Sequence, residues 1–86
     1  MPEICRFLGI LILIYYKDHS PSHFHAKYSD KSGTFSINDM RMIEGDLPPR
    51  VISLILEWAL INKSELLEDW ELAQSGKPLK KIAPLV

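Results

Sequence analysis

The sequence has one cysteine, four glycines and no excess of charge of either sign. Because Cys5 has no second thiol to pair with, an intrachain disulfide and a disulfide-stapled secreted scaffold are excluded. The 10 basic and 11 acidic residues give a formal net charge of −1, and residues 1–45 hold five of each sign. Neither half of the chain is basic, so bulk charge provides no general attraction to nucleic acid.

The sequence also lacks a long hydrophobic run. The longest apolar stretch, Phe7–Tyr16, has ten residues, whereas a membrane-spanning helix needs about 20. Arg6 is the only basic residue before it, Glu3 opposes that charge, and no small-residue cleavage site follows. We therefore expect a soluble, cytoplasmic protein of bacterial type without a membrane partner.

The overall composition is typical of one folded domain. The 86 residues are 47% hydrophobic and 24% charged, which supports a core rather than disorder. We expect a single domain over residues 1–86. Before Gly45, short runs rich in Ile, Tyr, Phe and Thr alternate with turn residues and predict β-strands. After Pro48-Pro49 the pattern becomes helical.

Four strands are expected before Gly45. The run from Ile10 to Tyr16 is continuously apolar, which predicts a central strand buried on both faces. The other three are expected at residues 23–28, 34–37 and 40–43, the last of them at a sheet edge. Short polar turns between successive strands favour an antiparallel meander.

Two helices are expected after the sheet, at residues 49–63 and 65–75, with Ser64 as N-cap of the second and Gly76 ending it. They are also compatible with one kinked rod. The first helix is apolar around most of its circumference, so it is either unusually enclosed or meets another chain, including a second copy of this one. The sequence thus predicts an α+β fold, with a four-stranded, mainly antiparallel sheet covered on one face by two C-terminal helices.

All three histidines lie within seven residues of one another, at His19, His23 and His25. On a strand, residues two apart point to the same face. His23 and His25 should therefore project together, with Phe24 on the opposite face toward the core. His19 stands in the preceding loop, next to Asp18. The sequence thus gathers four groups that are able to bind a metal ion or transfer protons.

Three interpretations of this cluster stay open. In the first, His19, His23 and His25 bind zinc or another divalent transition metal, Asp18 lies in or next to the coordination sphere, and water fills any open position. In the second, two imidazoles act as general base and general acid. In the third, the histidines are hydrogen-bonded groups of a sheet and its loop, without further chemistry.

RNA cleavage would suit the acid–base interpretation. A cation would stabilise the charge that develops on phosphorus, and the candidates are Lys27, Arg6 and Arg41. Such an enzyme would be a ribonuclease-type hydrolase or phosphotransferase. Aromatic side chains stack on bases in single-strand binders, but the sequence favours packing in the sheet for Tyr15, Tyr16 and Tyr28.

Short motifs over nearly the whole chain carry a resemblance to a known family. The most specific is Asp18-His19-x-Pro21-x-His23-Phe24-His25-Ala26. The others are Met1-Pro2-Glu3-Ile4, Arg6-Phe7, Gly9-Ile10, Leu47-Pro48-Pro49-Arg50, Glu57-Trp58, Trp70-Glu71-Leu72-Ala73 and Gly76-Lys77-Pro78-Leu79-Lys80-Lys81-Ile82. In these motifs the chain resembles the small bacterial domain-of-unknown-function-4160 family.

The resemblance implies a function only by association. Family members are often found beside another small uncharacterised domain, in the arrangement of a toxin–antitoxin pair. It therefore implies a toxin-like protein with an antitoxin-like partner and RNA as target, in which His23 and His25 share acid–base work and His19 orients the substrate. Arg6 or Lys27 would meet phosphate. The chain departs from the family at Ser22, where a second proline is usual, and we expect a looser loop there.

Overall fold

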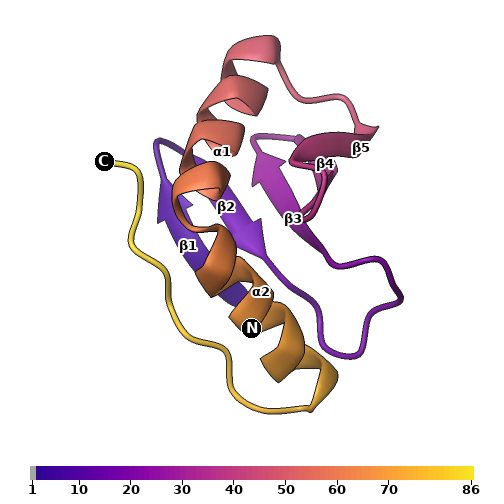
Figure 1. Cartoon of the computed structure of the whole chain (residues 1–86). Coiled ribbons are helices and arrows are strands. Elements are labelled where there is room, and N and C mark those ends of the chain that lie inside the picture. Colours follow the sequence, from indigo (N-terminus) through magenta and orange to yellow (C-terminus); the bar gives the residue numbers. More distant parts are fainter. Residues whose placement is uncertain (1) are drawn as a thin grey trace.

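A computed structural model describes residues 2–86, and Met1 lies outside this range. It contains one sheet followed by two helices (Figure 1), which confirms the predicted α+β class. The sheet has five strands rather than the four expected. The strands are β1 (Glu3–Phe7), β2 (Ile10–Leu13), β3 (His23–Tyr28), β4 (Lys31–Ser36) and β5 (Arg41–Gly45), and the helices are α1 (Pro49–Ile61) and α2 (Lys63–Gln74).

The strands follow the order β1-β2-β3-β4-β5, and every neighbouring pair is antiparallel. This is the predicted meander, with β5 at an edge as expected. The expected strand over residues 10–16 is present as β2, which is internal because it pairs with both β1 and β3, but its predicted end at Tyr16 is wrong. β2 ends at Leu13, and Tyr15 and Tyr16 lie beyond it with their side chains partly exposed.

The strand missing from the prediction is β1. A two-residue turn, Leu8-Gly9, joins it to β2, and both turn residues have positive φ, 50° and 78°. This conformation matches the twist of a tight hairpin. Because the turn lies inside a continuous apolar run, no polar residue marks it in the sequence. The hairpin therefore resembles one long buried strand.

Two glycines in the second half of the sheet serve close packing. A Cβ on Gly45, whose φ is +128°, would lie 2.4 Å from the Cα of Gly33 on the neighbouring strand. A Cβ on Gly33 would lie 2.9 Å from the sulfur of Met42. Gly33 lies within β4, which begins three residues before the predicted start at Thr34 because Lys31 already pairs with Tyr28 of β3.

Aromatic packing forms the centre of the core. Trp58 of α1 is fully buried, and its ring centroid lies 5.8 Å from that of Phe7 and 6.0 Å from that of Phe24. Phe24 and Phe35 stack with centroids 5.2 Å apart. Helix α1 thus covers the sheet face that carries these three phenylalanines. At its C-terminal end α1 leaves Leu60 and Ile61 exposed, so only part of its broad apolar surface is enclosed within the described residues.

The helix boundaries differ from those predicted. A single residue, Asn62, separates α1 from α2, and it serves as the N-cap position of α2. Its side-chain amide donates to the carbonyl of Trp58 at 2.9 Å. Ser64, the predicted cap, lies inside α2. Gly76 follows the end of α2 with φ +71°, and the amides of Gly76 and Lys77 bond back into the last turn, which is the helix-ending pattern expected of this glycine.

The segment after Gly76 is packed against the domain. The backbone amide of Ile82 donates to the carbonyl of Ile4 at 2.8 Å, and the indole of Trp58 donates to the carbonyl of Ala83 at 2.8 Å. In Figure 1 this yellow segment runs beside β1. The segment around Ile82 and Ala83 thus covers the outer edge of β1. No helix within residues 2–86 has both the length and the apolar character that crossing a membrane requires.

Asp69 is a buried carboxyl group in α2. One oxygen accepts the backbone N–H of Lys80 at 2.9 Å, and the other has no hydrogen-bond partner within residues 2–86. Burial raises the pKa of Asp69; Glu68 and Glu65 raise it further, while Lys80 opposes them. The folded state therefore binds this proton more tightly than the unfolded state does, so stability falls as pH rises from the unfolded pKa through the folded one.

Replacing Asp69 by asparagine should therefore stabilise the protein at neutral pH. The amide keeps the oxygen that accepts the Lys80 N–H but carries no charge. We expect a gain of about 1 kcal/mol at pH 7.5, or about 4–8 °C in melting temperature, and a much smaller gain near pH 4. Thermal melts followed by circular dichroism across this pH range measure it. An equal gain at every pH would contradict the explanation by charge.

Candidate metal centre

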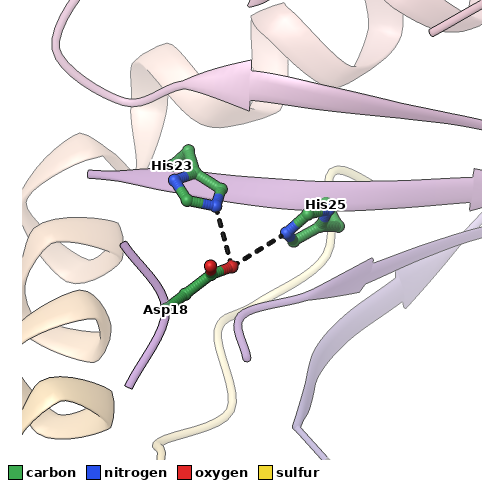
Figure 2. A group of neighbouring side chains, drawn as sticks. All are labelled: Asp18, His23 and His25. Atoms are coloured by element: carbon green, nitrogen blue, oxygen red, sulfur yellow. Dashed lines mark hydrogen bonds and ion pairs between the residues drawn. The ribbon is translucent and has the colours of Figure 1, made fainter. Parts of the chain in front are cut away.

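Three side chains converge on one carboxylate oxygen. Figure 2 shows Asp18 between the rings of His23 and His25, with both contacts made by the same oxygen. Oδ2 of Asp18 lies 2.9 Å from Nε2 of His23 and 3.3 Å from Nε2 of His25. We call Asp18, His23 and His25 the triad. The predicted pairing of the two strand histidines with Asp18 is thus present in the structure.

Strand β3 sets the direction of both histidines. Phe24 points into the core beneath α1, so His23 and His25 point to the opposite face of the sheet. His25 lies between Leu13 of β2 and Thr34 of β4, its partners in the sheet. His23 begins the strand, and its side chain is only 4% exposed because Trp70 of α2 packs against it at 5.0 Å between ring centroids.

The end of α2 holds the loop that carries Asp18. Nε2 of Gln74 donates to the Asp18 carbonyl at 2.9 Å, and the Lys17 amide donates to the Ala73 carbonyl at 3.2 Å. The His19 amide donates to Oδ1 of Asp18 at 2.8 Å. With Oδ1 engaged by this amide, Oδ2 is the oxygen presented to the two imidazoles. The sequence alone did not indicate Gln74 or Trp70, since both are close to the site only through the tertiary fold.

Ser22 fastens the other end of the loop. Its hydroxyl accepts a hydrogen bond from the Asn38 amide at 3.2 Å, and its carbonyl accepts one from the Ile37 amide at 3.1 Å. The position where a proline was expected from the family therefore carries hydrogen bonds to the segment between β4 and β5.

The tautomer of His23 follows from its two partners. Nδ1 lies 2.7 Å from the Pro21 carbonyl oxygen, which is only able to accept, so Nδ1 carries a proton. In the neutral imidazole, Nε2 then presents its lone pair to Oδ2 of Asp18, 2.9 Å away. Two lone pairs repel one another unless a proton or a cation lies between them. The geometry is therefore that of either an imidazolium–carboxylate pair or two ligands of one cation.

His25 is the more accessible of the strand histidines, with a quarter of its side chain exposed. Burial lowers its pKa below the usual value of 6.5, against the opposing effect of Asp18. Its Nδ1 lies 3.3 Å from the Thr34 hydroxyl, and the ring of Tyr15 packs edge-on at 4.7 Å between centroids. A lower pKa favours the neutral ring, in which one of the two nitrogens carries a lone pair for coordination.

Asp18 is held in its charged form. Burial alone would raise its pKa, but hydrogen bonds from the His19 amide and from the rings of His23 and His25 outweigh burial, and the net pKa is lowered. The site therefore combines one carboxylate with two imidazoles.

The remaining predicted residues lie around the triad rather than in it. His19 is 86% exposed, and its Nε2 is 3.8 Å from Oδ1 of Asp18. Lys27, two residues after His25 on β3, points to the same face and forms no ion pair within residues 2–86. Arg6 lies two strands away on β1 and is paired with Glu3 at 3.2 Å. Arg41, on β5, is likewise two strands from the histidines.

The dimensions of the triad suit a small cation. One ligand atom from each of its three residues lies within 4.8 Å of the other two. In tetrahedral zinc sites, N and O ligands about 2.0–2.2 Å from the ion are about 3.3 Å apart. The measured contacts of 2.9 and 3.3 Å are close to this separation. Two imidazoles and one carboxylate also form a donor set that first-row transition metals use with further positions open.

Comparison with known proteins gives one match. A family model described as "Domain of unknown function (DUF4160)" matches residues 9–71. The matched region includes the triad and most of both helices, whereas β1 and the segment after Gly76 fall outside it. No curated protein and no solved structure matches the chain.

Proposed function

Because the chain belongs to the domain-of-unknown-function-4160 family, and this membership assigns no chemistry, we propose a function from the site itself. The protein binds one divalent transition-metal ion through Asp18, His23 and His25. The observation that carries the proposal is the fixed tautomer of His23. Its protonated Nδ1 bonds to a backbone carbonyl while its Nε2 faces a carboxylate. Metal-bound histidines have this arrangement, since the second ring N–H fixes the ring for coordination by the first nitrogen.

Three protein ligands leave coordination positions for water or substrate. A bound transition metal supplies a Lewis acid and lowers the pKa of its water, which is the basis of metal-assisted hydrolysis. Within the chain, Oδ2 of Asp18 contributes the negative charge and the two imidazoles contribute neutral ligands. His23 is enclosed by Trp70, so access to the centre is on the side of His25.

A metal titration tests the proposal. Protein made without a histidine tag and stripped with a chelator is titrated with Co²⁺, and Zn²⁺ is then added as a competitor. We expect visible Co²⁺ bands that saturate at one equivalent and disappear on addition of Zn²⁺. Zn²⁺ at 100 times its Kd should stabilise the fold by about 2.7 kcal/mol. Mg²⁺, which prefers oxygen ligands, is the negative control. Absence of bands and of stabilisation would contradict metal binding.

A second candidate function is RNA cleavage, as in the toxin-like component of a toxin–antitoxin pair. The favouring observation is that Tyr15, His25 and Lys27 are grouped on the sheet face away from α1. An aromatic ring offers stacking to a base, and a free ammonium offers a contact to phosphate. In this function the imidazoles transfer protons without a metal ion. Binding of an antitoxin-like partner, and dimerisation through α1, also remain predictions.

Expression in a bacterial host tests the second candidate. A ribonuclease toxin should arrest growth when made without a partner, and replacing His25 by alanine should relieve the arrest. Purified protein should cleave a labelled RNA in the presence of a chelator. Replacing the exposed Lys31, which is paired with Asp46 at 3.7 Å, by alanine serves as control against the same change at Lys27. Harmless expression together with intact RNA would exclude the toxin function and leave the metal proposal unaffected.

A further inference from the structure

His19 is the histidine that the triad does not include, although it adjoins Asp18. Its side chain is 86% exposed, and its ring centroid lies 5.5 Å from that of His23. We propose that His19 is a removable fourth ligand, which closes the metal centre when it binds and opens it when it swings away. This inference rests on the proposed metal binding by the triad.

The hydrogen bonds of His19 leave its outer nitrogen free for coordination. Nδ1 lies 3.3 Å from the carbonyl oxygen of Ser20, which is able only to accept, so Nδ1 is the donor. In the neutral ring, Nε2 then carries the lone pair. It is 3.8 Å from Oδ1 of Asp18, on the carboxylate whose other oxygen joins the triad. His19 and His23 thus share one tautomer, each fixed by a backbone carbonyl.

The difference between the two rings lies in how firmly each is held. His23 is packed against Trp70 and is 4% exposed, whereas His19 has no aromatic neighbour besides His23 within residues 2–86. The His19 amide is fixed, because it donates to Oδ1 of Asp18 at 2.8 Å. The backbone is therefore anchored beside the metal position, whereas the side chain is exposed, and exposed side chains change rotamer within nanoseconds.

A removable ligand gives the centre two states. With His19 bound, three imidazoles and one carboxylate complete a four-coordinate site of the kind that structural zinc occupies. With His19 released, the position is open to water or to a small anionic or nitrogen ligand on the accessible side of His25. A ligand that occupies the open position competes directly with His19.

Cobalt spectroscopy of His19→Ala tests this role. Compared with the unchanged protein, the variant should bind Co²⁺ still at one equivalent but about 10- to 100-fold more weakly, which is less than expected for a fixed ligand. Its visible bands should weaken, because water replaces the imidazole and raises the coordination number. Added imidazole should restore the bands in His19→Ala and should have little effect on the unchanged protein. Ser20→Ala, an exposed change that keeps the backbone carbonyl, is the matched control.

The outcomes separate the two proposals. If His19→Ala binds Co²⁺ with the affinity and spectrum of the unchanged protein, His19 is not a ligand and only this inference fails. If the unchanged protein binds no Co²⁺, metal binding by the triad fails, and the role of His19 fails with it. Circular dichroism of the variant should match that of the unchanged protein, since the ring is exposed.

Discussion

Replacing Asp18 by asparagine should abolish tight Zn²⁺ binding without destabilising the metal-free fold. Oδ2 of Asp18 is the atom that His23 and His25 share, and an amide removes both its charge and most of its strength as a ligand. Loss of a hydrogen bond outside the coordination sphere costs about 10- to 100-fold in metal affinity, so we expect loss of a ligand to exceed 100-fold. Competition with a coloured chelator measures the affinity.

Although Asp18→Asn should weaken Zn²⁺ binding, it should not lower the stability of the metal-free fold. A neutral His23 in the metal-free protein would place the lone pairs of Nε2 and Oδ2 face to face at 2.9 Å, which is unfavourable. An asparagine amide placed there donates an N–H to Nε2, and its oxygen still accepts the His19 amide. The metal-free variant should therefore melt at or above the temperature of the unchanged protein.

The stability of Asp18→Asn also distinguishes a neutral His23 from a charged one in the metal-free protein. If His23 is charged there and Asp18 is its carboxylate partner, the neutral replacement lowers the melting temperature. A matched control is Asp30→Asn, which removes an exposed carboxylate from the turn between β3 and β4. Equal Zn²⁺ affinity in the two variants would contradict a role for Asp18 in metal binding.

Replacing Trp58 by alanine should largely unfold the protein at 37 °C. The ring is fully buried between Phe7 and Phe24, and its N–H bonds to the carbonyl of Ala83. Removing such a side chain costs about 3–5 kcal/mol, because it leaves a cavity as well as exposing apolar surface. Total stabilities are about 5–15 kcal/mol, and small domains lie at the low end.

Urea denaturation followed by far-ultraviolet circular dichroism measures this loss. Trp58→Phe keeps most of the ring but loses the hydrogen bond to Ala83, so its cost should be nearer 1 kcal/mol. Leu60→Ala, at an exposed position on the same helix, should change stability little. An alanine variant as stable as the phenylalanine variant would show that Trp58 is not the centre of the core.

The parts of the site that the sequence predicts are those fixed by local geometry. Alternation along β3 is sufficient to place His23 and His25 on one face and Phe24 in the core. The contact of Asp18 with both rings depends instead on Gln74, which is 56 residues away along the chain. No short-range pattern encodes that contact, since it arises only after α2 has packed beside the loop.

The differences between the predicted and the observed fold also have definite physical causes. β1 was missed because the turn at Leu8-Gly9 is as apolar as the strands it joins, so the usual polar punctuation is absent. The helix break was misplaced because Ser64 is a strong capping residue type, whereas the actual boundary at Asn62 has no side-chain capping bond. There the Asn62 amide bonds backward to Trp58 instead.

The contact of the C-terminal segment with β1 has a consequence for synthesis on the ribosome. The Ile4 carbonyl on β1 accepts its hydrogen bond from the amide of Ile82, and the Trp58 indole donates to the carbonyl of Ala83. Residues 82 and 83 are translated after every strand and both helices. The nascent sheet therefore emerges with the edge of β1 uncovered, a state open to pairing with neighbouring chains. Native closure of this edge therefore follows the synthesis of both helices, and a chain stalled before Ile82 should be a substrate for chaperones.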